Sequence, residues 1–135
     1  MRPFPLSATL FALVAFAGCA NPTPEPPDVT GAVTFDGEPV SGGIISFVPL
    51  DSGRPPGGAT ISEGRYQLDP AVGLKPGMYR VEIRWSRPTG EKREAGYGRS
   101  PDVFAEALPA KYHADSTLTV EVTAGANAHD FTLTK

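Results

Sequence analysis

The sequence is poor in cysteine and has no concentration of charge of either sign. One cysteine among 135 residues excludes a disulfide within the chain, so the fold depends on its hydrophobic core. The 12 basic and 15 acidic residues give a formal net charge of −3, with the two signs interspersed. Without a basic patch the chain lacks the electrostatic footprint of a nucleic-acid-binding protein. We therefore expect no nucleic-acid partner.

Long helices are also not expected, because the chain is rich in residues that interrupt them. It contains 15 prolines and 15 glycines. Proline lacks a backbone donor and breaks a helix interior, whereas glycine favours turns. A chain of this length suits one domain rather than two. The composition thus predicts a single domain of short strands joined by turns.

The N-terminal segment is organised like a secretory signal. Arg2 is the single charged residue before Cys19, and the apolar run that ends at Leu10–Ala17 leads to the small residue Gly18. A cationic start, an apolar stretch of about a dozen residues and small residues at a cleavage site are typical of exported proteins. The run is shorter than the roughly 20 residues that a membrane-spanning helix needs. We therefore expect residues 1–18 to be removed on export.

Phe16, Ala17, Gly18 and Cys19 resemble the bacterial lipobox, the motif read by the lipoprotein-processing enzymes. In proteins with this motif the cysteine thiol is diacylated and the chain is cleaved just before it, which implies that Cys19 carries a lipid. The motif usually has Leu where this chain has Phe16. A plain secretory signal with an incidental cysteine, or a buried structural cysteine, is the alternative. Ala20 replaces the Asp that retains some lipoproteins in the inner membrane, which implies an anchor in the outer membrane of the cell envelope.

The residues that follow Cys19 predict a spacer. Ala20–Pro27 has four prolines in eight residues, a composition that favours extended polyproline II at about 3.1 Å per residue. We expect a tether of roughly 25 Å between the bilayer and the domain. The chain then divides into a signal peptide (1–18), a lipidated cysteine with a proline-rich tether (19–27) and one domain (28–135).

The clearest strand covers Tyr79–Trp85. Its odd-numbered positions are apolar or aromatic and its even-numbered positions are charged. This period of two gives the strand one buried and one solvated face, whereas a helix would spread the charges around its circumference. Alternation and turn chemistry predict six further strands. They cover residues 29–36, 44–50, 59–62, 65–69, 118–122 and 131–133.

Seven short strands separated by turns predict an all-β fold, a seven-stranded antiparallel β-sandwich with one long loop. Asp36–Pro39 and Lys75–Gly77 have the residues of tight turns, and Glu63-Gly64 marks a hairpin. The predicted core consists of the apolar side chains that share one face of these strands. They are Phe35, Ile45, Phe47, Tyr66, Leu68, Tyr79, Val81, Ile83, Trp85, Leu118, Val120, Val122, Phe131 and Leu133.

The exception to the strand pattern is Ser86–Lys111, which is polar and interrupted by glycines and prolines. Within it, Ser100-Pro101-Asp102 has the features of a helix start: a capping residue, a proline at the first position and an acid near the positive end of the dipole. We expect a helical turn over Pro101–Ala107, ended by Pro109. The rest is expected to be a long loop, disordered over residues 88–98.

Three segments resemble the carboxypeptidase regulatory-like domain: Val29–Val33, Asp36–Val40 and Leu74–Val81. That family has the transthyretin-like, or prealbumin-like, seven-stranded sandwich. Leu108–Tyr112 and Ser116–Val122 are similar to the ending of small lipoproteins abundant in planctomycetes. Together these segments are spread along most of the mature domain, from residue 29 to residue 122. The resemblance implies a fold and a location, far more than an activity.

No catalytic constellation stands out, and we expect neither an enzyme nor a cofactor. Hydroxyisourate hydrolases, which share the fold that the resemblance implies, end in Tyr-Arg-Gly-Ser, whereas this chain ends in Phe131–Lys135. Intradiol dioxygenases bind iron with two tyrosines and two closely spaced histidines. Here the two histidines lie 16 positions apart. We therefore expect solvated histidines in place of an iron site built from Tyr112, His113 and His129.

Nucleophile and calcium chemistry have little support in the sequence. The serines lack a Gly-x-Ser-x-Gly setting, and the paired glycines follow no phosphate-loop spacing. Asp51, Asp69 and Asp115 are candidates for a calcium site at a loop end, since hard oxygen ligands often come from loops. No Asp-x-Asp-x-Asp run accompanies them.

Two functions of different classes remain. The first is a non-catalytic structural or protein-interaction module, anchored to the membrane through the lipid on Cys19. It would contact another envelope protein through an exposed edge strand or the long loop. The alternative is a protein that binds an extracellular glycan or small solute with residues 88–112, which an apolar pocket near that loop would favour. The candidate contact residues are Tyr97, Tyr112 and His113.

Overall fold

The computed structural model describes residues 18–19 and 22–135. The expected signal peptide up to Ala17, and Ala20 after the cysteine, therefore lie outside the described residues. Within the described residues the chain is all-β, with eleven strands, two single-turn 3₁₀ helices (η1, Pro70–Val72; η2, Ala110–Tyr112) and no α-helix. No helix in this part of the chain is long and apolar enough to cross a membrane.

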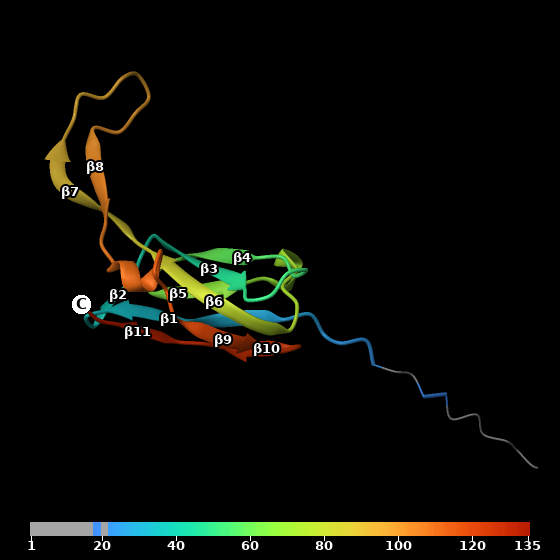
Figure 1. Cartoon of the computed structure of the whole chain (residues 1–135). Helices are drawn as coiled ribbons and strands as arrows, with labels where there is room; N and C mark the ends of the chain where they lie inside the picture. Colours follow the sequence, from blue (N-terminus) through green and yellow to red (C-terminus); the bar gives the residue numbers. More distant parts are fainter. Residues whose placement is uncertain (1–17, 20–21) are drawn as a thin grey trace, which may run out of the picture.

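Two sheets form the body of the molecule (Figure 1). The first is built on β1 (Asp28–Phe35), which pairs with four other strands. These are β2 (Glu38–Pro39), β5 (Arg65–Leu68), β10 (Ala126–Ala128) and β11 (Phe131–Leu133). The second sheet has the order β4-β3-β6-β9. Its strands are β4 (Gly57–Ile61), β3 (Gly43–Pro49), β6 (Gly77–Arg84) and β9 (Thr119–Val122).

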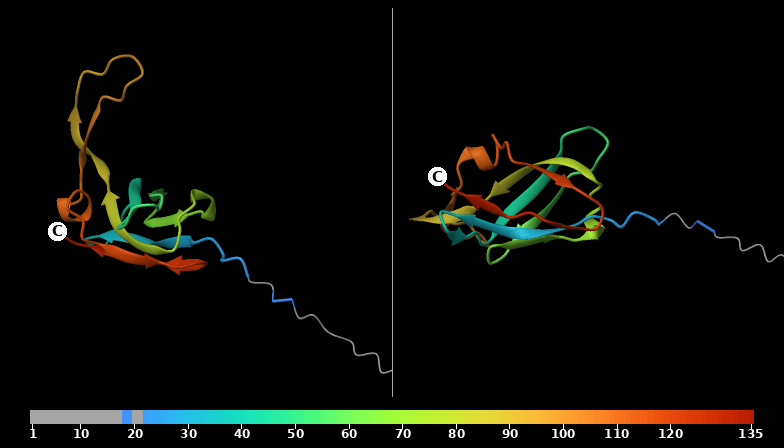
Figure 2. Two further views of the ribbon diagram at one scale, coloured as in Figure 1. Left: turned by 45° about the vertical axis from the view of Figure 1, so that its right-hand side comes forward. Right: turned by 90° about the horizontal axis from the view of Figure 1, so that it is seen from below.

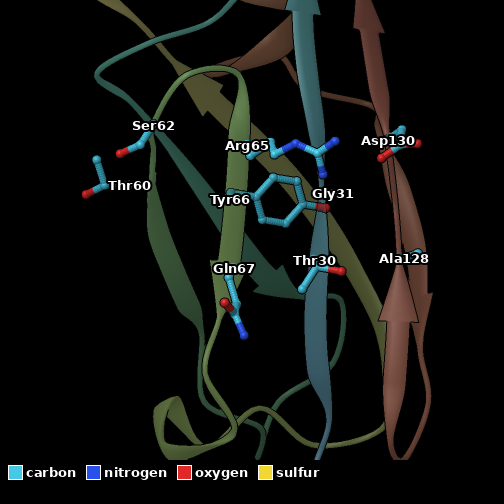
Figure 3. Close-up of a pocket in the computed structure, with 9 residues that line it drawn as sticks. All are labelled: Thr30, Gly31, Thr60, Ser62, Arg65, Tyr66, Gln67, Ala128 and Asp130. Atoms are coloured by element: carbon cyan, nitrogen blue, oxygen red, sulfur yellow. The ribbon is translucent and has the colours of Figure 1, made fainter.

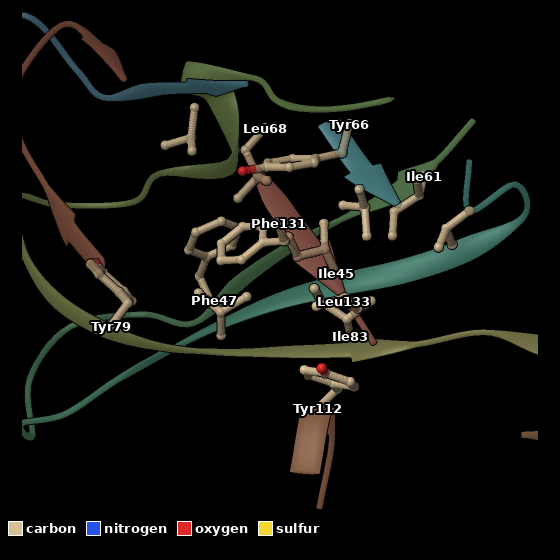
Figure 4. Packing of buried hydrophobic residues seen from close by; sticks show 14 of the residues in the cluster. Ile45, Phe47, Ile61, Tyr66, Leu68, Tyr79, Ile83, Tyr112, Phe131 and Leu133 are labelled. Carbon is tan, nitrogen blue, oxygen red and sulfur yellow. The ribbon is translucent and has the colours of Figure 1, made fainter. Parts of the chain in front are cut away.

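The buried side chains of both sheets form one hydrophobic cluster between the layers (Figure 4). Aromatic rings join the sheets there: the Phe47 ring of β3 lies 6.1 Å from the Tyr66 ring of β5, centroid to centroid. Of the predicted core, Phe35, Leu118 and Val120 are partly buried, and all the other members are buried. The cluster also contains residues that were not predicted: Val29, Val33, Val40, Ile61, Leu74, Leu108 and Tyr112.

The described residues form eleven strands where seven were predicted, and the purely antiparallel pairing that was predicted was wrong. β1 pairs in parallel with both β10 and β11, with Val29 opposite Asn127 and Val33 opposite Phe131. Period-two alternation tells which residues face the core but carries no information on strand direction. A turn at Gly125, whose φ is +79°, leads the chain into β10.

The break between β10 and β11 has its own hydrogen bonds. His129 donates its backbone N–H to the Thr30 carbonyl at 2.9 Å. The Ala32 N–H donates to the Asp130 carboxylate at 2.8 Å, so a side chain replaces a backbone acceptor in the ladder. Tyr66 donates its hydroxyl to the His129 carbonyl at 2.6 Å. Gly31 leaves room for this approach, because a Cβ there would lie 1.8 Å from the His129 oxygen.

The predicted long loop with a helical turn was also wrong. Ser86–Lys92 forms β7 and Asp102–Glu106 forms β8, and the two pair as an antiparallel ribbon that leaves the body (Figures 1 and 2). The Asp102 N–H does donate to the Ser100 hydroxyl at 3.2 Å, the local bond that also begins helices. The strand continues from there because its backbone pairs with β7 and because Asp102 forms an ion pair with Lys92.

Candidate functional site

The β7–β8 ribbon, together with the turn that joins its strands, forms an arm outside both layers of the body (Figures 1 and 2). β7 continues β6 through Trp85, so the arm extends a strand of the second sheet. A seven-residue strand spans roughly 23 Å. Every residue of β7 is exposed, and among the described residues each arm strand pairs only with the other. The arm therefore offers two open backbone edges.

The base of the arm is fixed by Trp85, which is 4% exposed although its neighbour Ser86 is exposed. Its indole Nε1–H donates to the Ser41 carbonyl at 2.8 Å. The Arg87 guanidinium lies 4.5 Å from the centre of the indole ring and pairs with Glu38 at 3.4 Å. A buried indole is held in one orientation when its N–H donates to a carbonyl and a cation lies above its ring face.

Glu106 ties the two strands of the arm together where they leave the body. One carboxylate oxygen accepts from the Trp85 N–H at 2.8 Å and from the Leu108 N–H at 3.1 Å. The Ala107 N–H donates to the Trp85 carbonyl at 2.8 Å. Since a charged acceptor makes stronger hydrogen bonds than a neutral one, this group sets the direction in which the arm projects.

Hydrogen bonds between the two strands hold the outer part of the arm, and glycine supplies the backbone conformation that it requires. The Thr89 hydroxyl donates to the Val103 carbonyl at 3.1 Å, and the Arg93 N–H donates to the Pro101 carbonyl at 2.9 Å. Gly90 has φ +87°, and the pairing register shifts between Pro88 and Lys92. A bulge of this kind increases the twist of a ribbon.

Two aromatic side chains on the arm are exposed. Tyr97, at the tip, is fully exposed, and Phe104 on β8 is 53% exposed. Exposed aromatic side chains on a projecting element are typical of contact surfaces, because tyrosine and phenylalanine bury much area at little cost in conformational entropy. Of the three predicted contact residues, Tyr97 is the one that lies on the arm.

The other two predicted contact residues lie away from the arm. Tyr112, on η2, is buried; its hydroxyl donates to the Thr134 carbonyl and accepts from the Thr134 N–H, both at 2.9 Å. His113 is partly buried, with Nε2 3.2 Å from the Leu108 carbonyl and Nδ1 3.5 Å from an Arg84 nitrogen. Because the Leu108 carbonyl can only accept a hydrogen bond, Nε2 is the donor of that contact. The structure thus uses both residues to fasten the chain after β8.

The expectation of solvated histidines was wrong for His129 too, which is partly buried. Its buried Nε2 has no hydrogen-bond partner among the described residues. Of the calcium candidates, Asp51 pairs with Arg54 at 2.7 Å, and Asp69 accepts from the Ala71 N–H at the start of η1. Across residues 18–19 and 22–135, no three His, Cys, Asp or Glu side chains are grouped closely enough to hold a metal ion.

Cys19 is exposed and has no disulfide partner. The residues before β1 contact the turn between β9 and β10: the Gly125 N–H donates to the Glu25 carbonyl at 3.2 Å, and the Asp28 N–H donates to the Gly125 carbonyl at 2.9 Å. Pro27 is buried. The last part of the expected tether is therefore attached to the body, at the end of the molecule remote from the arm (Figure 1).

Sequence reasoning missed the residues that build the arm base. Trp85 and Ser41 are 44 positions apart, and Arg87 and Glu38 are 49 positions apart. No local pattern encodes such contacts. The one available signal was the alternation of β6, which continues to Trp85 and stops at the base of the arm.

No known protein family, curated protein or solved structure matches this chain.

Proposed function

We propose that this protein is a lipid-anchored protein of the cell envelope, without catalytic activity, that presents the β7–β8 arm to a protein partner. The observation that carries the proposal is the placement of tether and arm at opposite ends of the body (Figure 1). β1 begins beside Gly125, where the tether attaches, and ends at Phe35. Phe35 pairs with Glu38, and Glu38 pairs with Arg87 at the base of the arm.

Because the tether and the arm lie at opposite ends of the body, a membrane anchor would orient the arm. With a lipid on Cys19 held in the outer membrane, the end of the body that carries the tether faces the bilayer and the arm faces away from it. A ribbon of roughly 23 Å then reaches beyond the body. The fixed base makes the reach directional, because a rigid presenting element loses less conformational entropy on binding.

The chemistry of the arm favours a protein over a glycan or small solute. Two open strand edges offer backbone donors and acceptors that an extended segment of a partner can pair with. Tyr97 and Phe104 supply aromatic area next to those edges. The surface hollow of about 580 Å³ is lined by no residue from 88–112. This hollow therefore does not give the arm the concave site that a solute would need.

The proposal includes membership of the carboxypeptidase regulatory-like, transthyretin-like fold. β10 and β11 follow successive parts of β1, so they can be taken as one strand interrupted at His129 and Asp130. With the arm set aside and β2 counted as a short extension of the first sheet, seven strands remain. Their positions agree with the seven segments that the sequence predicted. In this interpretation the arm is an insertion between β6 and β9.

The anchor is tested by the mass of the mature N-terminus together with fractionation. We expect a chain that begins at Cys19 and carries diacylglycerol, found in the membrane fraction. Cys19→Ser should release the protein from that fraction, because serine has no thiol to carry the lipid. Cleavage elsewhere with a free thiol, or unchanged partitioning of the variant, would contradict the anchor.

The arm is tested by photo-crosslinking in intact cells. A photoreactive amino acid at position 97 should give a discrete adduct with one protein. The same group at Thr119, an exposed position on β9 of the body, serves as the matched control and should give none. Adducts from both positions, or from neither, would count against a partner bound by the arm.

A further inference from the structure

The outer face of the first sheet has an open hollow of about 580 Å³ (Figure 3). Residues of β1, β4, β5 and β10, and two residues just beyond β4 and β10, line it. Most of the lining side chains are polar: Arg65, Asp130, Gln67, Thr30, Thr60 and Ser62. Ala128 and Gly31 also line it and have no side chain long enough to fill it.

The pairing register places a cation and an anion on opposite sides of β1. Arg65 of β5 is the partner of Ala32, and Asp130 accepts the N–H of Ala32 from the other side at 2.8 Å. Two strand spacings of about 4.8 Å separate the flanking backbones. The residue of β1 between them is Ala32, whose side chain is short, and the Arg65 guanidinium extends over β1 toward Asp130 (Figure 3). One level along the strand, Gln67 and Ala128 flank Thr30 in the same way.

These charged groups do not neutralise each other. Among the described residues, Arg65 forms no ion pair within 4.0 Å and its guanidinium donates no hydrogen bond. The side-chain amide of Gln67 forms no hydrogen bond with these residues either. Asp130 is held by one oxygen, Oδ1, which leaves Oδ2 open. Unpaired charges of opposite sign that converge on a hollow are the arrangement that binds a ligand with both charges.

We propose that this hollow binds a short zwitterionic peptide by its two ends, the carboxylate at Arg65 and the ammonium at Asp130. A guanidinium binds a carboxylate through two parallel N–H donors, and the free Asp130 oxygen accepts from an ammonium. Thr30 of β1 and Gln67 of β5 lie beside the space between the ends, whereas Thr60 and Ser62 line the hollow on the other side of Arg65 (Figure 3). A sugar fits less well, because the one aromatic residue of the lining, Tyr66, is buried and offers no face for stacking. This site goes beyond the proposed function, since the arm takes no part in it.

The test is an NMR titration of the ¹⁵N-labelled mature chain in detergent micelles with L-alanyl-L-alanine. We expect saturable shifts of the amides at Thr30, Ala32 and Gln67. N-acetylation of the peptide removes its ammonium, and amidation removes its carboxylate, so each derivative should bind about 10-fold more weakly, the effect of roughly 1.4 kcal/mol.

Two variants assign the ends. Asp130→Asn keeps an oxygen for the Ala32 N–H and should weaken the dipeptide about 10-fold but leave the N-acetyl derivative unchanged. Arg65→Gln should also weaken binding of the dipeptide about 10-fold but leave binding of the amide derivative unchanged. Arg99→Gln, on the arm, is the control and should bind like the wild type.

Absence of saturable shifts at the hollow, equal binding of glucose, or variants that bind like the wild type would overturn the proposal. The crosslink from position 97 tests the arm separately. A negative titration with a positive crosslink would therefore reject the hollow and leave the proposed function standing.

Discussion

Gly31→Ala is expected to destabilise the domain more than any other exchange of glycine for alanine that keeps φ negative. The added Cβ would lie 1.8 Å from the His129 carbonyl oxygen and 2.8 Å from the Tyr66 hydroxyl. Neither atom is the free end of a flexible chain, because the hydroxyl donates to that same carbonyl. β1 must therefore move away from the break between β10 and β11.

The cost can be estimated from what the shift removes. The bonds from Tyr66 to the His129 carbonyl and from the His129 N–H to Thr30 are worth about 1 kcal/mol each. Overpacking adds about 1–3 kcal/mol. The sum of about 3–5 kcal/mol is a large part of the 5–15 kcal/mol typical of a small domain.

Urea denaturation followed by tryptophan fluorescence measures this difference in free energy of unfolding. Gly96→Ala is the control, because nothing lies within 4 Å of a Cβ there and its φ is not in the left-handed region. Alanine at that position should be neutral or stabilise by about 0.5 kcal/mol through the unfolded state. A loss below about 1 kcal/mol for Gly31→Ala would refute the account of the close approach at His129.

The remaining predictions concern the arm base and the core tyrosine. Glu106→Gln should weaken the two hydrogen bonds at the base by about 1 kcal/mol in total and speed amide hydrogen exchange in β7 and β8, with exchange in β3 unchanged. Equal acceleration in β3 would contradict a local role. Burial, and then the Asp130 carboxylate, raises the pKa of Tyr66 above its ordinary 10.0, so its contribution to stability is complete below pH 10 and is lost as the pH rises further. Tyr66→Phe should therefore lose less stability above pH 10 than the wild type does, and parallel losses in the two proteins would show that Tyr66 is not responsible.

Strand positions could be predicted because they depend on local alternation. In β6, the predicted buried positions Tyr79, Val81 and Ile83 are all inaccessible to solvent. Strand direction could not be predicted, since parallel and antiparallel partners require the same pattern of buried residues. The parallel pairing of β1 with β10 and β11 depends on the path of the whole chain.

The arm illustrates a different limit. Ser100, Pro101 and Asp102 make the same local bond in a helix cap and in the turn that leads into β8. Glycines at 90, 96 and 98 favour a loop, but two of them supply the positive φ that a twisted ribbon and its turn require. The choice between these outcomes rests on the ion pair of Lys92 with Asp102 and on the distant contacts of Trp85.

The placement of Tyr97 was accessible from the sequence because a tyrosine amid polar residues and glycines has no core to enter. The placement of Tyr112 could not be predicted, since this residue also follows a polar stretch and yet is buried. Its hydroxyl bonds to the backbone of Thr134, 22 positions away. Residues close in sequence thus serve opposite roles, one exposed at the tip of the arm and one fastening the C-terminus.

Depth measurements on the lipidated protein in vesicles test the central claim most directly. Cys19 is the sole cysteine and its thiol would be consumed by the lipid, so a cysteine introduced at position 97 or at Ala124, beside the turn that holds the tether, can be labelled alone. Acceptor-labelled lipids should take more energy by resonance transfer from a fluorophore at position 124 than from one at position 97. Stronger transfer from position 97, or equal transfer from both positions, would contradict an arm that is presented away from the membrane.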